Sequence, residues 1–142
     1  MTDYKKVFLD TAPLIYLLDA NEVYGEKIRE ILEMLLNNDV RIVTSVITVE
    51  EYLVYPYRTE NSEKVDVFED FLNECGIIVY PVNYETAVKA AKIRAAYSHF
   101  KAMDSLQLAA AIVYDCQLFI TNDRQLRQFK ELKCITVDEW GK

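Results

Sequence analysis

In the stretch DSLQLAAAIVYDCQLFITND, residues 104–123, an alanine-rich apolar segment leads into a short apolar run. Residues 105–114 have the pattern of a buried helix, and residues 117–121 have that of a buried strand. An acid marks each end of the stretch, because Asp104 opens the expected helix and Asp123 follows the expected strand. A helix that leads directly into a buried strand is typical of α/β folds.

The same alternation of helices and strands extends along the whole chain. Strands are expected at residues 5–10, 40–44, 77–80, 117–121 and 134–137. Helices are expected at residues 12–18, 22–36, 45–52, 62–75, 85–98, 105–114 and 124–130, with a loop-like break at 55–61. Such alternation favours a parallel sheet covered on both faces. We therefore expect an α/β fold, a three-layer α/β/α sandwich around a central parallel sheet of four to five strands, in one domain over residues 1–142.

The composition is that of a globular protein, with 51% hydrophobic and 27% charged residues among 142. No apolar run is long enough to span a bilayer, and the first residues lack a signal-peptide core, so we expect a cytoplasmic protein without a membrane partner. The net charge of −7 disfavours a large nucleic-acid surface. It leaves room for a small one anchored by metal ions.

Several classes of site are excluded by the residues that the chain lacks. Cys75, Cys116 and Cys134 are far apart and form no C-x-x-C pair, so a zinc or redox site is not expected. His99 is the only histidine, which excludes H-E-x-x-H zinc chemistry. The three glycines form neither G-x-G-x-x-G nor a Walker loop, so a classical nucleotide-binding loop is not expected either.

Four acids stand at the ends of the expected strands and helices: Asp10, Glu51, Asp104 and Asp123. The carboxyl ends of parallel strands lie along one edge of a sheet, where open α/β folds place their sites. Four carboxylates that meet there repel one another unless a hard divalent cation lies between them. The sequence therefore predicts a Mg²⁺ or Mn²⁺ site, of the kind that carries out phosphoryl chemistry.

Each of these acids also has an ordinary explanation. Asp10, Asp104 and Asp123 could cap helices, as aspartate does at strand–helix turns. Glu51 could be a solvated helix residue. A chance gathering of all four at one sheet edge is the weaker explanation, so we favour the metal site.

The motifs around the acids resemble those of PIN domains, and the resemblance covers essentially the whole chain. The four matching segments, in order, are residues 8–16, 45–51, 103–111 and 120–123. In the second motif the acid stands three residues after Thr48, which selects Glu51 over Glu50. The length of the chain is also similar to that of the toxins of bacterial and archaeal VapBC toxin–antitoxin pairs. Many relatives carry a further acid where this chain has Gln125, which weakens the case for a second metal ion.

The resemblance implies a metal-dependent endoribonuclease. Asp10, Asp104 and Asp123 would hold Mg²⁺ or Mn²⁺ directly or through water, and Glu51 would complete the cluster. Water would attack the RNA phosphodiester, and family members are thought to leave a 3′-hydroxyl and a 5′-phosphate. The resemblance also implies a homodimer and an antitoxin peptide in a groove near the acids, with an arginine paired to the carboxylates.

Short polar residues beside the acids allow two interpretations each. Thr11 could orient a carboxylate around the metal or could cap the following helix, and the sequence does not separate the two. Thr121 could orient a carboxylate as well, although we favour an ordinary strand residue. Asn122 is expected in a turn, from which it could also form a hydrogen bond near the metal.

Candidate contacts to RNA lie close to the acids in the sequence. Lys101, Arg124 and Arg127 are the candidates for phosphate contacts. Tyr55 and Tyr57 lie just after Glu51, and either could stack on an RNA base or belong to a partner interface.

Three rival functions can be compared with the sequence. A haloacid-dehalogenase-type phosphatase needs a second aspartate where this chain has Ala12. A receiver domain needs a phosphoacceptor aspartate after the third strand, where residues 80–82 provide none. A non-catalytic PIN-like RNA- or protein-binding module is the remaining alternative. Such modules usually lose one or more acids, whereas this chain keeps four.

Overall fold

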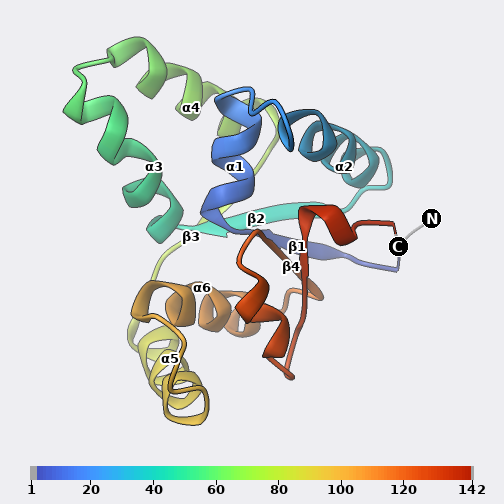
Figure 1. Ribbon diagram of the computed structural model, residues 1–142, viewed down its shortest axis with the longest axis vertical. Helices are drawn as coiled ribbons and strands as arrows, with labels where there is room; N and C mark the ends of the chain where they lie inside the picture. The colour runs from blue at the N-terminus through green and yellow to red at the C-terminus, as the bar shows by residue number, and fades with distance from the viewer. Residues whose placement is uncertain (1–2, 142) are drawn as a thin grey trace.

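The computed structural model describes residues 3–141, which build a five-stranded sheet in the order β3-β2-β1-β4-β5 (Figure 1). Its strands are β1 (Lys6–Leu9), β2 (Arg41–Ser45), β3 (Ile78–Tyr80), β4 (Leu118–Thr121) and β5 (Lys133–Thr136). Every neighbouring pair is parallel, so the carboxyl ends of all five strands lie along one edge. The predicted α/β fold with a central parallel sheet is confirmed.

Helices cover both faces of this sheet (Figure 1). One face carries α1 (Thr11–Leu18), α2 (Gly25–Asn37), α3 (Val46–Arg58) and α4 (Ser62–Glu74), and the other carries α5 (Tyr84–Ala96) and α6 (Ala102–Val113). Two short 3₁₀ segments, η1 (Arg124–Gln128) and η2 (Val137–Glu139), follow β4 and β5. Among residues 3–141, no helix combines the length and the apolar character that a membrane span requires.

The strands are buried on both faces, and their side chains alternate between two hydrophobic cores. Val7 and Leu9 of β1 belong to the core under α1 and α2, whereas Phe8 belongs to the core under α5 and α6. Phe8 stacks there on Phe119 of β4, with ring centroids 5.1 Å apart. Burial on both faces explains why these strands appear in the sequence as continuous apolar runs rather than as an alternating pattern.

The predicted break at residues 55–61 starts too early, because α3 continues through Pro56 to Arg58 and only residues 59–61 separate it from α4. A proline inside a helix removes one backbone hydrogen bond and usually ends or kinks the helix. Here Pro56 is itself buried, and Tyr52, one turn earlier, stacks on Phe68 of α4 with ring centroids 4.5 Å apart. The packing of α3 against α4 therefore keeps this segment helical. Tyr55 and Tyr57 consequently lie on a helix rather than in a loop.

The expected starts of two helices also need correction. Asp10, not Thr11, is the N-cap of α1, and its side chain accepts a hydrogen bond from the Thr11 backbone N–H. α6 begins at Ala102, so Asp104 lies within its first turn and Lys101 occupies the N-cap position. Both corrections concern the site, because they place Asp10 at the start of α1 and Asp104 in the first turn of α6.

Candidate metal centre

The four acids predicted from the sequence all line one open pocket at the carboxyl edge of the sheet. Asp10 follows β1 and Asp123 follows β4, and these two strands are neighbours in the centre of the sheet. Asp104 reaches the pocket from the first turn of α6, and Glu51 from the second turn of α3. The remaining lining residues are Thr11, Ala12, Ile15, Tyr16, Thr121, Asn122 and Arg124. Residues far apart in the sequence are thus brought together by the parallel topology.

Asp10 is the most buried of the four acids and is held by three donors. Its Oδ1 accepts from the Thr11 backbone N–H at 2.9 Å and from Gln107 Nε2 at 3.3 Å. Its Oδ2 accepts from the Thr121 hydroxyl at 2.8 Å. Burial raises the pKa of Asp10 to about 6, and the nearby charges of Asp104 and Glu51 act in the same direction. The hydrogen bonds from Thr11 and Thr121 lower the pKa and offset part of that rise.

Asp104 is half-buried, and its pKa is also raised. Burial is the largest cause, followed by the charges of Asp123 and Glu51, while the charge of Lys101 acts in the opposite direction. The acids are therefore close enough for their charges to repel one another. Within residues 3–141, however, no three carboxylates converge into a ready-made metal-binding group. They share a pocket without meeting at one point.

The donor set of the pocket fits a hard divalent cation. It offers carboxylate and hydroxyl oxygens, and neither cysteine nor histidine is among the lining residues. Magnesium takes few direct carboxylates and keeps several of its waters, so it does not need four acids in direct contact. An open pocket with separated carboxylates is compatible with an ion that is held partly through water.

Two threonines fix the positions of the acids. The Thr11 hydroxyl donates to Glu51 Oε1 at 2.6 Å. The Thr121 hydroxyl donates to Asp10 Oδ2 and accepts from the Asp123 backbone N–H at 3.1 Å, so it connects two of the acids. The interpretation of Thr121 as an ordinary strand residue is therefore incomplete. Asn122 donates to the Tyr16 hydroxyl at 2.7 Å, at the rim of the same pocket.

Helix capping accounts for two of the four acids. Asp10 caps α1, and Asp123 caps η1 by accepting from the Gln125 backbone N–H at 3.0 Å. Asp104 and Glu51 occupy no cap position in α6 and α3. Capping explains why an aspartate suits the ends of β1 and β4, but it does not explain why two further acids face them across the pocket.

The candidate RNA contacts fall into two groups. Arg124 lines the acid pocket, and the charge of Lys101 acts on Asp104. Arg127 instead pairs with Glu139 at 3.4 Å. Tyr55 and Tyr57 are exposed on α3, at 61% and 63% of their surface. The structure thus brings Lys101 and Arg124 to the acids and ties Arg127 to another partner.

A buried polar cluster beside the pocket was missed by the sequence analysis. It consists of Thr44, Ser45, Thr48 and Gln107, all of them buried. Gln107 stands in the apolar part of α6, three residues after Asp104, and therefore lies on the same helix face as this acid. A large polar residue on the buried face of a mostly apolar helix was the signal that could have identified it.

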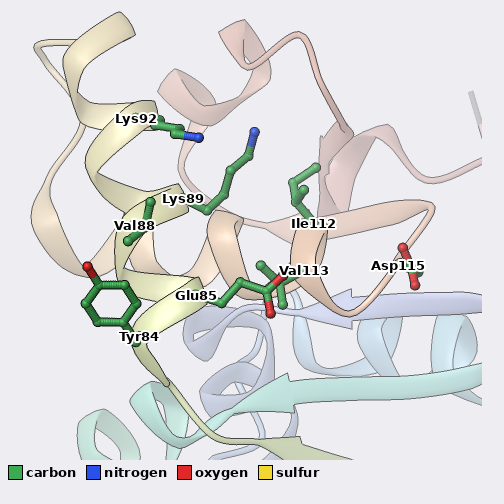
Figure 2. A pocket seen from close by; sticks show the side chains of 8 residues that line it. All are labelled: Tyr84, Glu85, Val88, Lys89, Lys92, Ile112, Val113 and Asp115. Carbon is green, nitrogen blue, oxygen red and sulfur yellow. The ribbon is translucent and has the colours of Figure 1, made fainter.

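A second hollow, between α5 and α6, lies away from the acids (Figure 2). Its lining residues include Tyr84, Val88 and Ile112, together with Lys89 and Lys92. Lys89 is engaged in an ion pair with Glu131 at 2.6 Å. None of the four acids contributes to this hollow, so its chemistry is separate from that of the acid pocket.

The chain belongs to the PIN domain family, whose model matches residues 7–132. No curated protein sequence matches it. Among solved structures, it is similar to VapBC-1 from nontypeable Haemophilus influenzae, with 21% identity, a TM-score of 0.76, and coverage of 94% of this chain and 99% of the other. It is also similar to VapBC2 from Rickettsia felis bound to a DNA fragment from its promoter, with 18% identity, a TM-score of 0.74, and coverage of 92% of this chain and 98% of the other. DNA-bound VapBC from Salmonella typhimurium is similar as well, with 21% identity, a TM-score of 0.73, and coverage of 93% of this chain and 98% of the other. At these identities the likeness establishes the fold.

Replacing Asp10 by asparagine should stabilise the metal-free protein at neutral pH. The pKa of Asp10 rises from 3.8 to about 6 on folding, so the ionised carboxylate destabilises the folded state by about 3 kcal/mol above that range. This penalty is absent below the pKa of Asp10 in the unfolded chain. It grows as the pH rises towards the pKa of Asp10 in the folded protein and is complete above that value. Relative to Asp10→Asn, the wild type should lose about 2 kcal/mol of unfolding free energy between pH 4 and pH 7.

Urea denaturation in EDTA across this pH range measures the difference. Asp66→Asn, which changes an exposed aspartate of α4, serves as the control and should follow the wild type at every pH. Parallel stability curves for the wild type and Asp10→Asn would contradict the burial of an ionised Asp10.

Proposed function

We propose that this chain is a metal-dependent endoribonuclease and the toxin of a VapBC-type toxin–antitoxin pair. The proposal is carried by the four carboxylates that four different elements deliver to one open pocket at the carboxyl edge of the sheet. Membership of the PIN family supports a nuclease, and the similar fold of several VapBC proteins supports a toxin.

Asp10, Asp104 and Asp123 would hold Mg²⁺ or Mn²⁺ directly or through water, and Glu51 would complete the cluster. When bound, such an ion lowers the pKa of a water molecule and neutralises charge on the phosphate. The carboxylates are held ready for this role by their neighbours, since Thr121 donates to Asp10 and Thr11 donates to Glu51.

The RNA phosphate would enter the open side of the pocket. Arg124 stands there beside the acids and can offset the repulsion between their charge and that of the phosphate. Lys101 is close enough to Asp104 to do the same from the start of α6. No lining residue is a cysteine, serine or histidine, and the two threonine hydroxyls of the pocket donate to Glu51 and Asp10. We therefore assign the role of nucleophile to water rather than to a side chain.

A groove beside the acid pocket suits the antitoxin peptide. It lies between α1, α3 and α4 and shares Ile15 and Glu51 with the acid pocket. Leu18, Tyr55 and Pro56 provide apolar walls, on which the apolar face of a peptide helix could pack. An arginine of that peptide could then pair with Glu51. We further propose that the toxin is a homodimer and acts on RNA in the cytoplasm.

Cleavage of a mixed RNA pool tests the proposed activity. The wild type should cut RNA with Mg²⁺ or Mn²⁺ and not with EDTA. Asp104→Asn should reduce the rate by at least about a hundredfold, the upper end of the loss typical for residues that only support a metal ligand. Retention of cutting by the variant, or in EDTA, would contradict the assignment of the site. No cutting by either protein, together with no Mn²⁺ binding in calorimetry, would favour the non-catalytic binding module.

Arg124 and Arg127 form a matched pair for testing the phosphate contact. In an Asp104→Asn background, which prevents cleavage, Arg124→Ala should weaken RNA binding. A plot of log affinity against log salt concentration should also become less steep, by about one unit of slope. Arg127→Ala should leave both quantities nearly unchanged, because Arg127 is paired with Glu139. Fluorescence anisotropy over a salt series provides the measurement. Equal effects of the two substitutions would show that only the overall charge matters.

A further inference from the structure

The buried amide of Gln107 connects α6 to two of the acids through hydrogen bonds. Gln107 lies in the apolar part of α6 with 1% of its surface exposed. A buried amide is costly unless its donors and its acceptor all find partners. The hydrogen-bond partners of this amide therefore show which groups it connects in this part of the pocket.

Each group of the amide has a partner, and the partners fix its orientation. The Ser45 hydroxyl accepts from the Ile47 backbone N–H and donates to Gln107 Oε1. Gln107 Nε2 donates to the Thr48 hydroxyl at 2.8 Å and to Asp10 Oδ1 at 3.3 Å. An ionised carboxylate can only accept hydrogen bonds, so the nitrogen end of the amide faces Asp10.

A second route leads from the same nitrogen to Glu51. The Thr48 hydroxyl accepts from Gln107 Nε2 and lies 2.7 Å from the Thr44 hydroxyl and 3.1 Å from the Thr11 hydroxyl. Because Thr11 has only one hydroxyl proton, which it gives to Glu51, Thr48 is the donor in its contact with Thr11. Thr11 in turn donates to Glu51 Oε1 at 2.6 Å. One amide thus contacts Asp10 directly and reaches Glu51 through two hydroxyl groups.

We infer that Gln107 is a positioning residue, which holds Asp10 and Glu51 in register with Asp104 so that the three can share one ion. The inference rests on the proposed function. Asp10, Glu51 and Asp104 come from the end of β1, from α3 and from α6, which are separate elements. Gln107 stands one turn after Asp104, so α6 carries one acid and fixes the position of the other two. A glutamine that served only core packing would not need a carboxylate from another element as its partner.

Replacing Gln107 by leucine keeps the size of the side chain and removes both donors. The affinity for Mn²⁺, measured by calorimetry, should fall by about tenfold to a hundredfold, the usual effect of removing a residue that orients metal ligands. The Mg²⁺ concentration for half-maximal cleavage should rise by a similar factor, while the KM for RNA stays unchanged. A purely structural role would change the unfolding temperature and leave the affinity of the folded protein unchanged.

Two further substitutions provide the controls. Ser105→Ala removes a different buried polar group of α6, a hydroxyl that has no hydrogen-bond partner within residues 3–141, and should change the affinity by less than about twofold. Thr48→Val removes the connection to Glu51 and keeps the contact between Gln107 and Asp10. The double variant Gln107→Leu, Thr48→Val should lose no more affinity than Gln107→Leu alone, since both changes break one network. Thr48→Val also tests the inference if Gln107→Leu does not fold.

The outcomes separate this inference from the proposed function. Failure of the wild type to bind Mn²⁺ would overturn both. Binding by the wild type with unchanged affinity in folded Gln107→Leu would overturn the positioning role and leave the metal site standing. Unchanged affinity in Thr48→Val would overturn the part of that role that concerns Glu51. If the affinity losses of the two single variants add in the double variant, Gln107 and Thr48 do not act through one network.

Discussion

The burial of a carboxylate at the end of the central strand β1 is the constraint on which the rest of the site depends. Asp10 is 8% exposed, and its pKa of about 6 measures how poorly this position tolerates a negative charge. Three donors reduce the cost, namely the Thr11 backbone N–H, the Thr121 hydroxyl and the amide of Gln107. Each donor comes from a different element, so the parts of the protein that surround Asp10 are tied to one another through it. Such a charge is better balanced by a cation than by hydrogen bonds alone.

The topology of the sheet explains why further acids come close to Asp10. With the order β3-β2-β1-β4-β5 and every strand parallel, β1 and β4 end side by side at the centre of one edge. Asp123 lies two residues after the end of β4, and α3 and α6 start from the same edge, so Glu51 and Asp104 reach the same pocket. Burial is the main cause of the raised pKa of both Asp10 and Asp104, and the charges of the neighbouring acids raise it further. This gathering of charge is the physical basis for the proposed ion and for the phosphodiester chemistry.

Features that depend on local sequence could be predicted, and features that depend on tertiary contacts could not. The strands and the placement of the acids at their ends follow from apolar runs that end in an acid. The continuation of α3 through Pro56 does not, because it is stabilised by packing against α4, as in the stacking of Tyr52 on Phe68. The link made by Thr121 is visible only when β1 and β4 are paired. Gln107 was missed for the same reason, since its partners lie far away in the sequence.

Anomalous diffraction from a bound manganese ion would show whether the four acids hold a metal. Crystals grown with Mn²⁺ and measured at the manganese absorption edge would give an anomalous difference map that locates the ion without assumptions about its ligands. We expect one strong peak in the pocket, in direct or water-mediated contact with Asp10, Asp104 and Asp123, and no such peak in crystals of Asp104→Asn. Wild-type crystals with no peak in this pocket, at an Mn²⁺ concentration that supports RNA cleavage, would contradict the proposed metal site.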